Sequence, residues 1–121
     1  MLSLSIIRSD LKEIRYYYSR KEMFDEAFKC MGQSDIVEKA EKYNNAVKSA
    51  PAKLYDLYFS LYIKNNTQES LSNELCYTPE YIQMLNKQLL KFLQTKLKEE
   101  EENKWILLKK QSMYIAQESI L

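Results

Sequence analysis

The sequence contains no histidine, a single glycine, two prolines and two cysteines among its 121 residues. Without histidine, the chain lacks the commonest general base, the commonest zinc ligand and the partner of every Ser–His or Cys–His nucleophile pair. A single glycine cannot supply a phosphate-binding loop or a dinucleotide fingerprint, and two cysteines alone cannot complete a four-ligand zinc site. We therefore predict that the protein is not an enzyme and that it uses no cofactor or metal ion.

The scarcity of glycine and proline also leaves the backbone few natural breaks, which favours an all-α fold. Apolar residues make up 45% of the chain and charged residues 29%, a balance that is typical of a globular protein. A chain of this length is predicted to form one compact domain with a modest core.

The two cysteines, Cys30 and Cys76, form no disulfide framework and indicate reduced thiols in a cytoplasmic protein. No apolar run in the sequence approaches the roughly 20 residues that a membrane span requires. The opening residues MLSLSIIRSDLK have neither a basic leader nor a long apolar segment, so no signal peptide is expected. We predict that the protein has no membrane partner.

The net charge is only +1, which is not the signature of a strong nonspecific nucleic-acid binder. The charge is unevenly distributed. Residues 52–98 carry six lysines against one aspartate and three glutamates, whereas residues 99–121 carry five glutamates against three lysines. The middle of the chain is therefore slightly basic and its end slightly acidic.

The first 50 residues predict an N-terminal helical hairpin. Residues 5–31 are expected to form one long helix that ends at Gly32, and residues 35–50 a second helix that is capped by Ser34. Apolar residues recur at helical spacing in both segments. The consecutive tyrosines 16–18 cannot all face one side of a helix, so at least one of them must be exposed or contact a partner.

Residues 51–98 predict a helix-turn-helix unit that is preceded by a supporting helix. The supporting helix starts at Pro51 and ends at Asn65–Asn66, because asparagine tolerates the left-handed conformation. Thr67 is placed to cap a short helix, QESLSNEL, and Thr78 to cap a longer one that opens with Pro79 and runs to about residue 97. Only CY separates the two helices, which is the spacing of a helix-turn-helix.

Apolar spacing assigns an inner and an outer face to these two helices. Leu71 and Leu75 are expected to point inward from the first helix, and Tyr77 to lie between the helices as an inward aromatic wedge. The second helix has one apolar stripe at helical spacing. The members of that stripe are Ile82, Leu85, Leu89 and Leu93.

The outer face of the second helix is where base contacts are predicted, since such a helix enters the major groove of DNA. Gln83 would pair with adenine, Glu80 would accept from cytosine, and Met84 would touch a thymine methyl group. The other predicted DNA-binding residues are Lys87, Lys91, the flanking Tyr81 and the two capping residues Thr67 and Thr78.

The end of the chain combines an acidic stretch with an apolar one. KEEEENK, residues 98–104, is compatible with either a solvated helix or a linker, and an amphipathic tail follows at residues 105–121. Trp105, Leu108 and Ile115 share one helical face, which must be buried either on the N-terminal hairpin or against a second chain. We expect a homodimer interface at these three residues.

The helix-turn-helix region resembles a known family. LYDLYFSLYI, ESLSNEL, CY and TPEYIQMLNKQLLKFL are similar to the successive parts of the fourth region of bacterial sigma factors. The earlier stretch LKEIRYYYSRKEMFDEA resembles small phage transcriptional regulators of the ArpU/RinA type. The resemblance implies a DNA-binding transcription regulator of phage or mobile-element origin, with double-stranded DNA as its partner and RNA polymerase as a possible second one. Cys76 replaces the usual turn glycine and Ser72 the usual alanine.

A second interpretation treats the chain as a helical protein-interaction module. In that case the tyrosine-rich faces or the Trp105 segment would bind a host protein such as polymerase or a nuclease, because tyrosine and tryptophan dominate interface hot spots. The two interpretations differ in one structural feature. DNA reading requires that the face from Glu80 to Lys91 is left uncovered by the rest of the fold.

Overall fold

The computed structural model describes residues 2–31 and 35–120, and the side chains of residues 2–29 and 35–110. Within these residues the chain is all-helical, as predicted, with no strand. The elements are α1 (Leu4–Ser19), α2 (Lys21–Met31), α3 (Asp35–Val47), α4 (Ala52–Tyr58), the π-helical turn η1 (Phe59–Ile63), α5 (Gln68–Leu75) and α6 (Pro79–Ile120).

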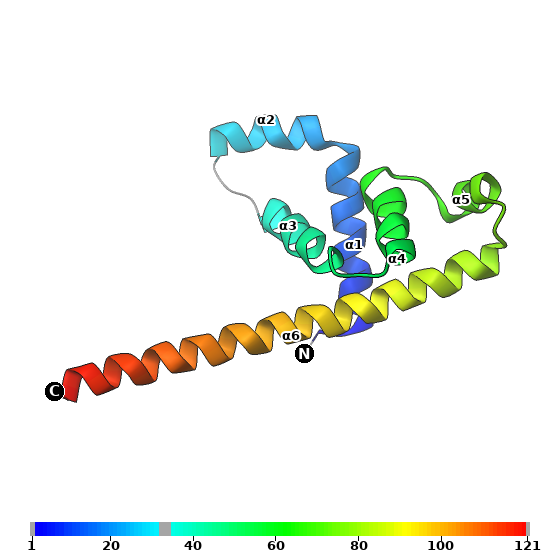
Figure 1. Cartoon of the computed structure of the whole chain (residues 1–121). Helices are drawn as coiled ribbons and strands as arrows, with labels where there is room; N and C mark the ends of the chain where they lie inside the picture. The colour runs from blue at the N-terminus through cyan, green and yellow to red at the C-terminus, as the bar shows by residue number, and fades with distance from the viewer. Residues whose placement is uncertain (1, 32–34, 121) are drawn as a thin grey trace.

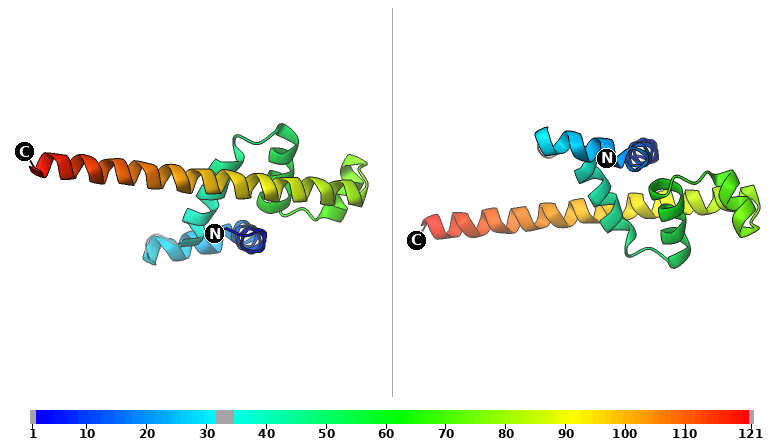
Figure 2. Two further views of the ribbon diagram at one scale, coloured as in Figure 1. Left: turned by 90° about the horizontal axis from the view of Figure 1, so that it is seen from below. Right: turned by 90° about the horizontal axis from the view of Figure 1, so that it is seen from above.

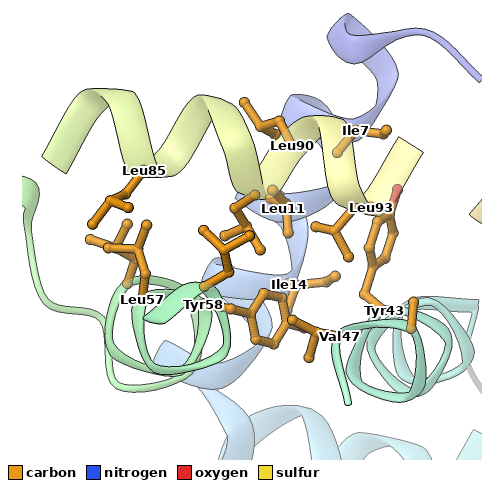
Figure 3. Packing of buried hydrophobic residues seen from close by; sticks show 14 of the residues in the cluster. Ile7, Leu11, Ile14, Tyr43, Val47, Leu57, Tyr58, Leu85, Leu90 and Leu93 are labelled. Carbon is orange, nitrogen blue, oxygen red and sulfur yellow. The ribbon is translucent and has the colours of Figure 1, made fainter. Parts of the chain in front are cut away.

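The long helix α6 is the element on which the others assemble (Figure 1). Its first half packs against α1, α3, α4 and α5, and its second half extends away from the body of the protein. Figure 2 shows the same extension from two further directions. One hydrophobic core joins all these helices, and Figure 3 shows residues of α1, α3 and α4 meeting α6. The largest fully buried side chains are Ile7, Leu11, Ile14, Tyr43, Val47, Tyr58, Ile82, Leu89, Leu90, Leu93 and Leu97.

The prediction of one continuous helix over residues 5–31 is wrong. The helix breaks at Arg20, whose backbone angles are φ −131° and ψ 33°, and α2 leaves at a steep angle to α1 (Figure 1). The break places the start of α2 beside the end of α1, where Tyr17 donates to Asp25 at 2.9 Å and the centroids of the Phe24 and Tyr17 rings are 5.8 Å apart. The expected two-helix hairpin is therefore a three-helix unit, with α3 packed on α1.

Two details of that unit concern the sequence predictions. Of the consecutive tyrosines, Tyr17 is buried, Tyr18 is half-buried and Tyr16 is exposed, so the expectation that one must be exposed is confirmed. The predicted caps at Gly32 and Ser34 lie outside the described residues.

Buried tyrosines connect the elements of the core through hydrogen bonds. Tyr43 in α3 donates to Asp10 in α1 at 2.6 Å, and Tyr58 in α4 donates to Asn44 at 2.6 Å, while Asn44 donates in turn to Tyr18 at 2.8 Å. Burial raises the pKa of Tyr43 well above its ordinary value, and the hydrogen bond to Asp10 adds to that rise. Burial likewise raises the pKa of Tyr58.

The supporting helix has the predicted position but not the predicted regularity. Pro51 precedes α4, and the chain widens after Tyr58 into the π-helical turn η1, where the Lys64 amide donates to Phe59 at 2.9 Å. The predicted end at Asn65 is confirmed, because that residue adopts a left-handed conformation with φ 62°. Leu61 in this turn is buried, and so is Tyr58 directly before it.

Candidate nucleic-acid interface

Both predicted helix caps are formed in the structure. The Thr67 hydroxyl accepts a hydrogen bond from the Ser70 amide at 3.0 Å, at the start of α5. The Thr78 hydroxyl accepts one from the Tyr81 amide at 3.2 Å, and α6 begins at Pro79. These bonds satisfy amides that would otherwise have no partner at the helix ends, and they fix where each helix starts.

The turn between α5 and α6 is closed by Ser72, a residue for which no contact was predicted. Cys76 lies in the left-handed region, with φ 57° and ψ 30°, and its amide donates to the Ser72 carbonyl. The Tyr77 amide donates to that carbonyl as well, at 3.1 Å, and the buried Ser72 hydroxyl donates to the Tyr77 carbonyl. The only signal in the sequence was a serine where the resembling family has alanine.

Two of the predicted inward residues of this unit are exposed instead. Leu71 is buried, but Leu75 is 49% exposed and Tyr77 is 40% exposed. Tyr77 lies edge-on to Tyr81 at 4.9 Å between ring centroids rather than between the helices as a wedge. The reason is that α5 packs against α6 and not closely against α4. A cavity of about 280 Å³ lies between α5 and α4 and is lined by Leu57, Leu71 and Leu75.

The first half of α6 presents the two faces that the apolar spacing predicted. Ile82, Leu85, Leu89 and Leu93 are all buried. The opposite side is exposed, and no other part of the described chain covers it. This reading face consists of the five exposed residues Glu80, Gln83, Met84, Lys87 and Lys91.

Tyr81 lies beside the reading face and is held in place from two sides. It is half-buried, its ring meets the Tyr77 ring, and its hydroxyl accepts a hydrogen bond from the Lys53 ammonium at 3.4 Å. Lys53 in α4 is thereby brought next to the start of α6. This contact links the supporting helix to the edge of the reading face, and the sequence prediction did not include it.

The lysines around the reading face keep their charges available for an anion. Within the described residues, Lys87 and Lys91 form no ion pair; the ion pairs of the structure involve Lys21, Lys39 and Lys42 elsewhere. Such unpaired, exposed lysines are suited to phosphate contacts. Lys64 lies over the Phe59 ring, with its nitrogen 5.3 Å from the ring centroid, near the N-terminus of α5.

The acidic segment and the apolar tail are one continuous helix. Residues 98–104, for which helix and linker were both open, belong to α6. The predicted dimer residues Trp105 and Leu108 are exposed, so they are not buried on the N-terminal unit. The side chain of Ile115 lies outside the described residues.

No known protein family matches the chain. The chain also matches no curated protein and no solved structure. Among the described residues, no helix is both long enough and apolar enough to cross a membrane. The helices and their exposed surfaces are therefore the basis on which a function is assigned.

Proposed function

We propose that the protein is a sequence-specific, DNA-binding transcription regulator of phage or mobile-element type that acts as a homodimer. The observation that carries this proposal is the uncovered reading face on a helix whose start is capped and fixed by a tight turn. A helix in this position has the form of the recognition helix of a helix-turn-helix protein, which enters the major groove.

The order of side chains along α6 supports direct readout of bases. Gln83 carries both a donor and an acceptor for an adenine edge, Glu80 accepts from a cytosine amino group, and Met84 offers an apolar contact to a thymine methyl group. All three lie in the first two turns of α6, where the helix end can reach furthest into the groove.

Phosphate contacts would fix the register of the protein on the duplex. Lys87 and Lys91 lie further along the same face, where the helix leaves the groove and meets the backbone. At the start of α5, amides close to the Thr67 cap offer a further contact for a phosphate oxygen. With a net charge of +1, one module provides few such contacts, and two linked modules would bind far more tightly than one.

The test is DNA binding by the full chain against sequences selected from a random pool. Gln83→Ala combined with Met84→Ala should weaken binding to the selected sequence by roughly 30-fold or more, since two base contacts are lost and each is worth about 1 kcal/mol or more. Binding to unrelated DNA should stay unchanged. A control is Met23→Ala combined with Asn45→Ala, which removes a methionine and an amide side chain at exposed positions of α2 and α3. Equal affinity of the two double variants would refute the reading face.

A second candidate function, a protein-interaction module, is favoured by the exposed apolar segment at residues 105–108. In this function, residues 105–108 of α6 would bind a host protein such as RNA polymerase. The selection experiment separates the two functions, because an interaction module yields no enriched sequence. A regulator that touches promoter DNA and polymerase together would pass the selection and still bind polymerase through the tail.

A further inference from the structure

The second half of α6 has an exposed apolar segment that follows a run of glutamates and is separated from it by Asn103 and Lys104. Residues 99–102 are four glutamates, and the next apolar residues are Trp105, Ile106, Leu107 and Leu108, which are 52–63% exposed. Lys109 and Lys110 follow directly. Four large apolar side chains in succession are an unusual amount of apolar surface to leave in water and point to a partner.

The rest of the same chain does not cover this segment. Among the side chains of α6 that the structure describes, Leu97 is the last fully buried one, and the ion pair from Lys42 to Glu101, at 3.8 Å, is the last one to the body of the protein. Beyond it the described side chains are exposed, and both views of Figure 2 show the helix running clear of the other elements. A partner must therefore come from outside the chain.

Charge discriminates between the two ways in which a second copy can pair with this helix. In a parallel pair, the four glutamates at residues 99–102 would lie next to the same four glutamates, and like charges at such a contact repel. In an antiparallel pair that is centred on the apolar segment, Glu102 of each copy lies next to Lys109 of the partner subunit instead. The charges along this part of the helix therefore favour an antiparallel pair of two copies over a parallel pair.

We propose that two copies pair antiparallel through the second half of α6, with Trp105 of each against Leu108 of the partner subunit. Trp105 and Leu108 are three residues apart and so share one face of the helix. Glu102 lies next to that face and would meet Lys109 of the partner subunit, and two-fold symmetry forms this pair twice. This arrangement rests on the homodimer of the proposed function, and its formation requires no DNA.

One contact within the chain supports the choice of face. The Lys109 ammonium lies 5.8 Å from the centroid of the Trp105 ring, so the two side chains lie on the same side of the helix. Lys109 therefore lies beside Trp105 at the edge of the proposed apolar contact. This is the side on which an antiparallel partner would present its Glu102.

The test is charge reversal in the full chain, measured by sedimentation equilibrium without DNA. Glu102→Lys and Lys109→Glu should each weaken the dimer by roughly tenfold, because each places two like-charged pairs at the contact. The double variant should return to within about threefold of the wild-type affinity, since both pairs are restored with their signs exchanged. Trp105 is the only tryptophan, so its fluorescence should shift to shorter wavelength as the dimer forms.

Control variants and alternative outcomes separate this arrangement from others. Glu100→Lys and Lys110→Glu make the same charge changes on the opposite side of the helix and should leave the dimer unchanged. A dimer that tightens in Glu102→Lys, or a double variant that stays weak, would overturn the antiparallel arrangement. A chain that is monomeric at every concentration would refute pairing altogether, and DNA selection would then show separately whether the reading face survives.

Discussion

Arg15 in α1 holds Asn65, fifty residues later in the sequence, in its left-handed conformation. The Arg15 guanidinium donates to the Asn65 side-chain oxygen at 3.2 Å and to the main-chain oxygens of Asn65 and Asn66 at 3.4 Å each. Thr67, the cap of α5, comes next in the chain. The N-terminal unit therefore fixes the point at which α5 begins.

Replacing Arg15 with alanine should lower the free energy of unfolding by about 2 kcal/mol, because hydrogen bonds to a charged group are worth about 1.5–3 kcal/mol and these are partly buried. Urea denaturation measures the change. Arg8→Ala removes an exposed arginine from the same helix and is the control. A loss no larger than that of the control would show that the Arg15 contacts do not fix the loop.

Replacing Cys76 with glycine should stabilise the protein by about 1 kcal/mol, because a residue with a Cβ atom is strained at φ 57° and glycine is not. Asn65→Gly is the matched comparison, since Asn65 has nearly the same φ, 62°, but binds Arg15 through its side chain. That variant should gain nothing or lose stability. A similar gain in both variants would contradict the importance of the Arg15 contact.

Replacing Ser72 with alanine should cost about 1 kcal/mol, the net value of one hydrogen bond, because the Tyr77 carbonyl loses its donor. The turn should loosen with it. Hydrogen exchange of the Tyr77 amide, which donates to the Ser72 carbonyl, would report this loosening directly. Ser70→Ala, at an exposed position of α5, should leave stability and exchange within error of the wild type.

Stability should fall as the pH rises above the ordinary tyrosine pKa near 10, because burial raises the pKa of Tyr43 in the folded state. The unfolded chain loses this proton first, so the contribution is complete below pH 10 and is lost as the pH rises through the folded-state pKa. Urea denaturation across this range measures the slope. Tyr43→Phe and Tyr58→Phe should each flatten it; an unchanged slope in both would assign the alkaline loss to other groups.

The parts of the fold that follow from local chemistry were predictable from the sequence. Caps at Thr67 and Thr78, the left-handed Asn65 and the apolar stripe of α6 depend on residues that are close together in the chain, and the structure confirms each of them. The exposure of the reading face followed from the same stripe, because a helix that buries one side presents the other.

The errors concern positions that packing between helices decides. Nothing in the sequence around Arg20 interrupts helical periodicity, yet the helix breaks there, and the break brings Phe24 and Asp25 onto Tyr17 of α1. Leu75 has the right spacing to be buried, but α5 packs beside α6 and leaves it exposed. The π-helical turn at Phe59–Ile63 likewise has no local signature that separates it from an ordinary helix.

Because α6 runs unbroken from Pro79 to Ile120, the direction of the tail is tied to the direction of the reading face by helical phase. One residue inserted within residues 98–104 would rotate the Trp105 side by about 100° relative to Gln83, and seven would bring it back to within about 20°. In a symmetric pair, the reading faces of both copies would rotate by the same angle, each about the axis of its own helix. In the proposed dimer, the acidic segment would set the mutual orientation of the two reading faces as well as the distance between them.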